Sequence, residues 1–345
     1  MNNSNRILPW QHTLWQGLMQ RLHEDRLPHA MLLTGPTGIG KESFAQTFAR
    51  AVLCEHLSAD ARPCGTCRGC LLNQAGTHPD NHWAGLLEDK KIIGVDQVRE
   101  ISASLNMKAH YSGYKVVVIS PAECMNTQAA NSLLKTLEEP APRSLLMLVT
   151  SNATALPATL RSRCQRIICT LPAQDVVASW LAAQLEPGHD AALLLALAGG
   201  APLAALQMAQ GGQADVISQR LNVLDGLERL LLNQVSPVAL AAIWLKFALP
   251  ETLYWVHSYI IDMIRLKSAE HPPLLANPDA RLRLQALAEQ LNLKTLYYQL
   301  DKIREASRLA VGQSNAQMLL EDILINWKMC STPGSGSGSV RMVKI

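Results

Sequence analysis

One stretch near the start decides the fold of this chain: Met31-Leu32-Leu33-Thr34-Gly35-Pro36-Thr37-Gly38-Ile39-Gly40-Lys41-Glu42. It is typical of a short apolar strand, a glycine-rich loop and the first turn of a helix. In such a loop successive backbone N–H groups converge on phosphate oxygens, and Lys41 adds its charge. The residue after the lysine is normally Ser or Thr, whose hydroxyl binds magnesium, but here it is Glu42. The stretch therefore predicts phosphate binding without a proper metal site, and its candidate nucleotide-binding residues are Gly35, Gly38, Gly40 and Lys41.

Composition restricts the class of protein. A chain of 345 residues is long enough for about two or three domains. Hydrophobic residues make up 48% of it, but aromatic residues only 5%, which favours helices rich in Leu and Ala. No apolar run reaches the roughly 18 residues of a membrane span, and Met1–Trp10 lacks a hydrophobic signal core, so we expect a cytosolic protein. A net charge of +3 is too small to indicate nucleic-acid binding from composition alone.

Four of the eight cysteines form a cluster in the sequence, Cys54, Cys64, Cys67 and Cys70. Their pattern is C-x9-C-x2-C-x2-C, and two-residue gaps let a tight turn direct adjacent sulfurs at one ion. Four thiolates fill a tetrahedral zinc site and leave no position for a substrate, so the predicted zinc is structural. Free buried cysteines or disulfides are the alternative, and His56 or His78 could replace one thiol.

Two further apolar runs predict buried strands of a parallel sheet, Tyr114–Ile119 and Ser144–Thr150, and a shorter strand covers Arg166–Cys169. In a phosphate-loop ATPase the strand corresponding to the first of these ends in an acidic pair that holds magnesium and polarises water. Here it ends in Ser120-Pro121-Ala122-Glu123, so the metal-holding Asp is absent. At the end of the second strand, Asn152 either senses a terminal phosphate or caps the following turn.

Helical patterns fill the rest of the chain. A helix is expected over Asn126–Leu137, and a short one over Leu156–Cys164 closes on Arg161 and Arg163. On spacing alone, these arginines are solvated or interact with the helix dipole. Beyond Leu171 no strand pattern returns, and the apolar periodicity predicts a small helical unit followed by an antiparallel bundle.

Three motifs together carry a resemblance to a known family: Leu133-Leu134-Lys135-Thr136-Leu137-Glu138-Glu139-Pro140, Ser162-Arg163-Cys164 and the four-cysteine cluster. In this order they resemble the clamp-loader subunits of bacterial DNA polymerase III, which belong to the AAA+ class, over about residues 5–330. The resemblance implies an α/β AAA+ domain, a RecA-like parallel sheet with an inserted zinc module, followed by an all-α lid and an all-α helical collar. We expect the AAA+ domain at 1–170 (zinc module about 54–80), the lid at 171–211 and the collar at 212–330.

The resemblance also implies a function. Clamp-loader subunits form a hetero-pentameric ring, with motor subunits of the tau/gamma type and a delta-type subunit, which loads the sliding clamp onto primer–template DNA. The Ser-Arg-Cys motif of this family carries an arginine finger that acts in trans on a neighbouring subunit's ATP, which corresponds to Arg163 here. The protein would be part of the DNA polymerase III holoenzyme, a nucleotidyltransferase complex, in the cytoplasm at the nucleoid-associated replisome.

Departures from the working ATPase pattern of the family predict a non-hydrolysing member, the stator. They lie at Glu42, at Ser120 and at Leu203, which stands where the lid arginine is expected. Binding of ATP or ADP without hydrolysis stays open. The alternatives are an active ATP-hydrolysing motor subunit, which Lys41 favours, and a free-standing zinc-dependent DNA-binding protein.

The end of the chain has a different character. Gly334–Ser339 alternates Gly and Ser like an engineered flexible linker, and Val340–Ile345 follows it as a short appendage. Residues 331–345 are therefore left out of the fold prediction.

Overall fold

A computed structural model describes residues 7–88, 90–105, 107–111, 113–211, 213–270, 272, 274–310 and 315–330, and the predicted linker and appendage lie outside these ranges. The chain divides into two compact units. The first comprises Met1–Gln184 with Gly200–Ala205, and the second comprises Leu185–Gly199 with Leu206–Ile345. The division falls inside the segment expected to form the lid, so a separate lid domain stays a prediction.

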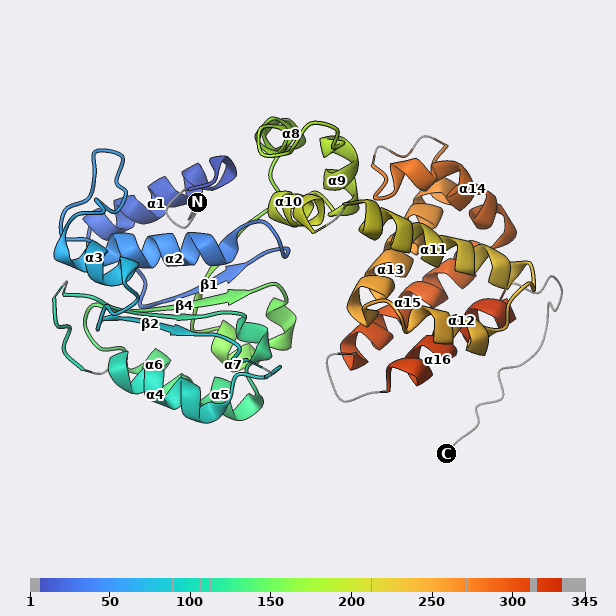
Figure 1. The fold of residues 1–345 in the computed structure, drawn as a ribbon. Helices are drawn as coiled ribbons and strands as arrows, with labels where there is room; N and C mark the ends of the chain where they lie inside the picture. The colour runs from blue at the N-terminus through green and yellow to red at the C-terminus, as the bar shows by residue number, and fades with distance from the viewer. Residues whose placement is uncertain are drawn as a thin grey trace. The chain divides into compact units, whose positions relative to one another are not determined.

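A five-stranded parallel sheet forms the centre of the first unit (Figure 1). Its strands stand in the order β2-β3-β4-β1-β5. Their bounds are β1 (Ala30–Thr34), β2 (Asn81–Ala84), β3 (Lys115–Ile119), β4 (Ser144–Thr150) and β5 (Gln165–Ile168). Strand β1 pairs with β4 on one side and β5 on the other, so that Leu32 lies opposite both Leu148 and Arg166. The predicted α/β fold is confirmed, and the phosphate loop begins at the carboxyl end of β1.

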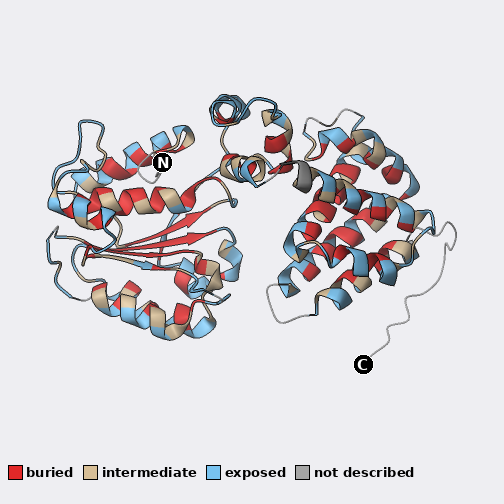
Figure 2. Ribbon diagram, in the orientation of Figure 1, coloured by how far each residue is buried: buried red, intermediate tan, exposed pale blue. Residues whose placement is uncertain are grey.

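Alternating residues of the central strands supply two separate cores, one on each face of the sheet. Met31 and Leu33 pack under the helices α1 (His12–His23) and α2 (Lys41–Val52). On the other face Leu32 packs with α4 (Val95–Leu105), α5 (Thr127–Ser132), α6 (Leu134–Glu138) and α7 (Ala158–Arg161). Figure 2 shows the inner strands β1, β3 and β4 buried between these layers, as expected for a parallel sheet covered on both sides.

Two local predictions need correction. The edge strand β2 was not predicted, because Asn81 and His82 begin it and only Ala84 is fully buried. The single helix expected over Asn126–Leu137 is instead two helices, α5 and α6, with a break at Leu133. The Ser132 hydroxyl donates to the Ala129 carbonyl at 2.7 Å, a local side-chain bond that competes with the helical ladder.

Among the described residues beyond 171 every regular element is helical, which confirms the predicted all-α region. The helices are α8 (Gln174–Ala182), α9 (Ala191–Leu197), α10 (Pro202–Gln210), α11 (Gln213–Leu231), α12 (Pro237–Trp244), α13 (Leu249–Ser268), α14 (Arg281–Gln290), α15 (Leu293–Leu309) and α16 (Ala316–Cys330). Helices α11–α16 enclose a core with Trp244, Tyr259 and Trp327. In the described part of the chain no single helix could cross a membrane by length and apolar content, although the bent pair α9–α10 passes that test jointly.

A buried carboxylate ties α13 to the chain that follows it. Asp262 is fully buried, and its oxygens accept hydrogen bonds from the backbone N–H groups of Ala276 and Asn277 at 3.0 and 2.7 Å. The side chains of Asn277 and Arg265 donate to the same carboxylate. Because the Asp262 carboxylate and Asn277 are buried away from water, their hydrogen bonds specify where this loop returns to the bundle.

Asp262→Ala should therefore destabilise the helical unit by about 1–3 kcal/mol, the cost of leaving the buried Asn277 N–H without its acceptor. Loss of hydrogen-exchange protection in α13 amides under mild urea would report this unit alone. The matched control is Asp301→Ala, because the Asp301 side chain is 78% exposed and its ion pair with Arg304 spans 3.7 Å. That variant should stay within about 0.5 kcal/mol of the parent, and equal effects of the two changes would contradict the prediction.

Candidate functional site

The phosphate loop adopts a conformation that requires glycine. Gly38 and Gly40 have φ angles of +80° and +85°, in the left-handed region. A Cβ on Gly38 would lie 2.7 Å from the Cβ of Ala204, so α10 approaches the loop too closely for any side chain. The Leu203 N–H donates to the Gly38 carbonyl at 2.9 Å, which fixes this approach.

The opposite side of the loop is held by a short 3-10 helix, Pro9–Gln11. The Trp10 indole N–H donates to the Ile39 carbonyl at 3.0 Å. The buried Gln11 amide donates to the Gly40 carbonyl at 2.8 Å. These bonds use loop carbonyls rather than loop N–H groups, which is compatible with phosphate binding through the N–H groups.

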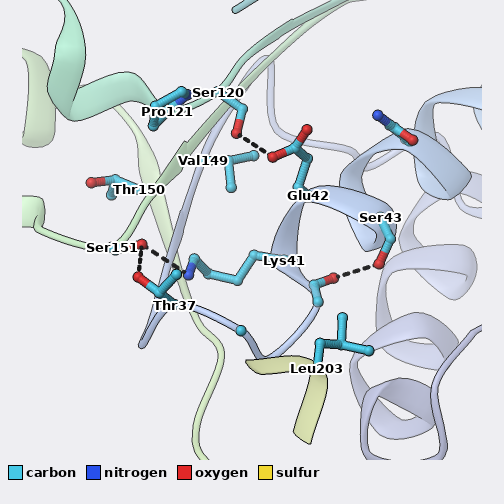
Figure 3. A pocket seen from close by; sticks show the side chains of 13 residues that line it. Thr37, Lys41, Glu42, Ser43, Ser120, Pro121, Val149, Thr150, Ser151 and Leu203 are labelled. Carbon is cyan, nitrogen blue, oxygen red and sulfur yellow. Dashed lines mark hydrogen bonds between the residues drawn. The ribbon is translucent and has the colours of Figure 1, made fainter. Parts of the chain in front are cut away.

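A cavity of about 450 Å³ opens above the loop. Its lining comprises Thr37, Gly38, Gly40, Lys41, Glu42, Ser43, Gln46, Ser120, Pro121, Val149, Thr150, Ser151 and Leu203. The Lys41 ammonium donates to the Pro36 carbonyl at 2.6 Å. It also donates to the Ser151 hydroxyl at 3.3 Å (Figure 3). Burial lowers the pKa of Lys41, and the nearby carboxylates of Glu123 and Glu42 oppose that shift. The predicted phosphate-binding lysine thus lies at the base of a cavity.

Glu42 and Ser120 each stand where a metal ligand is expected, and their side chains lie next to each other. Glu42 is in the first turn of α2, and Ser120 directly follows β3. The Ser120 hydroxyl donates to the Glu42 carboxylate at 3.4 Å across the cavity (Figure 3). The usual metal-binding pair, a hydroxyl after the lysine and a carboxylate at the strand end, is therefore present with its two positions exchanged. As a set of oxygen donors it suits a hard divalent cation.

Two other polar residues at the strand ends have structural partners. Glu123 accepts a hydrogen bond from the Ser151 backbone N–H at 2.9 Å, which joins the ends of β3 and β4. Asn152 stands at the N-cap of the 3-10 helix Ala153–Ala155 without a side-chain cap bond, and its side chain accepts from the Thr154 hydroxyl at 2.7 Å. Neither lines the cavity, whereas Leu203, at the position of the expected lid arginine, does. Ser151, which also lines the cavity, was not predicted as a site residue. Its position after a buried strand is the only sequence feature that could have indicated it.

Arg163 lies apart from this cavity, two residues beyond the end of α7. Its side chain is 37% exposed and forms an ion pair with Glu138 at 2.7 Å. The same guanidinium donates to the Thr159 carbonyl at 3.0 Å. Two anchors therefore hold the guanidinium at the surface. Glu138 belongs to the Leu133–Pro140 motif, so the ion pair joins two of the three motifs that carry the resemblance.

The four predicted zinc ligands converge at one point. The Sγ atoms of Cys54, Cys64, Cys67 and Cys70 all lie within 4.8 Å of one another, and no other such group of possible metal ligands occurs among the described residues. Three of the Sγ–Sγ distances are 3.6, 3.9 and 3.9 Å. A tetrahedron with Zn–S bonds of about 2.3 Å has edges of about 3.8 Å. The cluster therefore has the size of a tetrahedral zinc site.

The surroundings of the sulfurs favour the thiolate form at Cys64 but not at Cys54 and Cys70, because burial raises the pKa of these two thiols. Backbone N–H groups point at the sulfurs, among them that of Cys67 at 3.2 Å from the Cys64 Sγ and that of Cys70 at 3.4 Å from the Cys67 Sγ. Hydrogen bonds from Thr66 lower the pKa of Cys64 to about 6, whereas burial raises the pKa of Cys70. The His78 ring instead accepts from the Asp80 N–H at 3.1 Å and is not part of the ligand group.

Contacts outside the cluster join it to the sheet domain. Arg68, between two of the cysteines, donates to the Tyr111 hydroxyl at 3.0 Å, and its guanidinium lies 4.3 Å from the centre of that ring. Tyr111 is in turn held by its N–H bond to the buried carboxylate of Asp80 at 3.0 Å. The cysteine module is therefore connected to the start of β2 through Arg68, and also by the hydrogen bond that the Asn81 amide donates to Asn73 at 2.7 Å.

Comparison with known proteins gives consistent matches over nearly the whole chain. Residues 10–171 match the family described as DNA polymerase III, delta subunit, and residues 214–329 match DNA polymerase III, delta subunit, C terminal. The chain is 36% identical over 334 residues to DNA polymerase III subunit delta' of Pseudomonas aeruginosa, covering 96% of this chain and 99% of the relative. It is 32% identical over 333 residues to the subunit delta' of Escherichia coli K12, with 95% and 97% covered. Among solved structures, a gamma subunit-related protein of Thermotoga maritima matches with a TM-score of 0.41 at 15% identity, covering 92% of this chain and 99% of that one.

Proposed function

The chain belongs to the DNA polymerase III delta' subunit family, and from this premise we propose that it is the non-hydrolysing stator of a clamp-loader complex. In this role it helps to load the sliding clamp onto primed DNA, within a hetero-pentameric ring of tau/gamma-type and delta-type subunits. The complex is part of the cytoplasmic, nucleoid-associated replisome. Membership of the family supports the clamp-loader role, and the residues that line the cavity support the absence of hydrolysis.

The observation that carries this proposal is the position of Arg163. Glu138 and the Thr159 carbonyl together hold the Arg163 guanidinium at the surface. Its orientation therefore does not depend on a ligand bound to this chain. Arginine fingers act on the γ-phosphoryl group of another subunit's nucleotide, where they neutralise developing charge. We therefore assign Arg163 this role in trans on a neighbouring motor subunit.

The cavity of the chain itself supports the absence of hydrolysis. Glu123, the acidic residue after β3, is engaged by the Ser151 N–H and does not line the cavity. Leu203 offers no charge to a γ-phosphate. With neither a water-polarising carboxylate nor a lid arginine in place, Gly35, Gly38, Gly40 and Lys41 are left to hold ATP or ADP without cleaving it.

We further propose that Cys54, Cys64, Cys67 and Cys70 hold a structural Zn²⁺ ion, for which the tetrahedral spacing of their sulfurs is the support. The proposed domains are the AAA+ domain at 1–170, the lid at 171–211 and the collar at 212–330. The collar is proposed as the oligomerisation domain of the ring.

The first test compares the isolated chain with a complex reconstituted from tau/gamma-type and delta-type subunits. The isolated chain should show no ATP turnover above background, while addition of the chain to its partners should restore clamp loading. Turnover by the isolated chain that disappears in Lys41→Ala would instead support the active motor subunit. Salt-dependent DNA binding by the isolated chain would support a free-standing DNA-binding protein.

A further inference from the structure

We propose that Glu42 and Ser120 form a positionally exchanged ligand pair for a divalent cation of the Mg²⁺ class, bound together with the polyphosphate of a nucleotide in the phosphate loop. In an ordinary phosphate-loop site the hydroxyl follows the lysine and the carboxylate ends the neighbouring strand. This chain carries one carboxylate and one hydroxyl in the same two places, reversed. They are in contact at 3.4 Å (Figure 3).

Helix α2 and strand β3 fix the positions of Glu42 and Ser120. Glu42 follows Lys41 on α2, whose first turn begins at the loop, and Ser120 is 6% exposed at the end of the central strand β3. Both side chains line the same cavity as Lys41 and as the hydroxyls of Ser43, Thr150 and Ser151. The cavity thus offers one carboxylate among hydroxyl oxygens, the chemistry that hard cations prefer.

Charge explains why the cation should matter. The Glu42 carboxylate next to a bound polyphosphate would repel it, and Lys41 with the N-terminus of α2 offsets only part of that repulsion. A divalent cation between the carboxylate and the phosphates changes the sign of this interaction. Nucleotide binding by this chain should therefore require the cation.

The same contact has a competing interpretation with the opposite consequence. If the Glu42–Ser120 hydrogen bond only closes the cavity against anions, removing the charge of Glu42 should strengthen nucleotide binding. If the pair binds the cation, the same change should weaken binding in the presence of Mg²⁺. The sign of one measured effect therefore decides between them.

The test uses the full zinc-loaded chain and titration calorimetry with ADP, with Mg²⁺ present or omitted and no chelator added. Binding should be tighter by about tenfold or more with Mg²⁺. Glu42→Gln should remove that difference, whereas Glu42→Ser combined with Ser120→Asp, which restores the usual order, should keep it. Glu100→Gln, at an exposed position of α4, is the matched control and should behave as the parent. Circular dichroism checks that each variant is folded.

A second measurement reports the cation directly. Mn²⁺ added with ADP should give the electron paramagnetic resonance signal of a bound ion in the parent and a signal at least about tenfold weaker in Glu42→Gln. The cysteine cluster should not contribute, because thiolates favour zinc over Mn²⁺. Equal ADP affinity with and without Mg²⁺, tighter binding by Glu42→Gln, or no ADP binding at all would each overturn the proposal. None of these results bears on Arg163, whose role is measured by the ATPase of the assembled complex.

Discussion

Replacing Arg163 by alanine should lower the DNA-stimulated ATPase rate of the reconstituted clamp-loader complex by about 10³-fold at the site it serves. The expected reason is the loss of a positive charge that stabilises the transferred γ-phosphoryl group in the adjacent subunit. Clamp loading should fall with it. The stability of the chain should barely change, because the Arg163–Glu138 pair is exposed on both sides (37% and 53%), and such pairs contribute little. The measurement is the steady-state ATPase of the complex, with assembly verified by gel filtration.

Three control variants separate a finger from a general surface charge. Arg161→Ala removes an exposed arginine two residues away and should leave the ATPase unchanged. Arg163→Lys keeps the charge but loses the planar fork, so it should restore only a small part of the rate. Glu138→Gln keeps the arginine but removes its ion pair, so an intermediate rate is expected if this pair orients the finger. Normal clamp loading by the Arg163→Ala complex would contradict the assignment.

The fold was predictable wherever one type of side chain dominated a segment. Strands β3 and β4 are continuous apolar runs, and the structure buries both of them completely. Strand β2 gave no such signal, because an edge strand needs pairing with one neighbour only and tolerates Asn81 and His82. The break at Leu133 depends on the hydroxyl of Ser132, whose bond to Ala129 has no counterpart in the apolar periodicity.

The candidate sites were predictable to the extent that they are local in sequence. The spacing of Cys64, Cys67 and Cys70 was enough to predict that their sulfurs lie together. The glycines of the phosphate loop, Gly35, Gly38 and Gly40, are likewise close in the sequence. The contact between Glu42 and Ser120 spans 78 positions, so each residue could only be judged against its own motif. Judged within its own motif, each residue predicts the loss of one metal ligand. The fold instead places the two side chains in contact in one cavity.

Removing zinc should unfold the cysteine module while leaving the central sheet intact. Structural zinc contributes about 10–16 kcal/mol of apparent binding free energy in small zinc modules, and that energy is folding energy. The segment around Cys54–Cys70 buries little apolar surface, since Leu57 and Leu71 are exposed, and its other contacts are a few polar ones such as Arg68–Tyr111. By contrast, the strands β1, β3 and β4 are buried between two apolar cores that contain none of the four clustered cysteines. Hydrogen exchange after treatment with a strong zinc chelator should show lost protection in residues 64–75 and retained protection in these strands.

The cysteines outside the cluster provide the matched comparison. The parent chain and Cys124→Ser should each contain about one zinc ion per chain by elemental analysis, because Cys124 lies outside the ligand group. Cys67→Ser should lose the zinc, since a serine hydroxyl is a poor substitute for a thiolate and the Cys70 N–H would lose its sulfur acceptor. The Arg68–Tyr111 contact should then be lost, so exchange should also rise in residues 107–111, the segment that Asp80 and Arg68 hold from two sides. Full protection of residues 64–75 in the zinc-free chain would mean that the thiols pack without a metal, and the structural role assigned to zinc would fail.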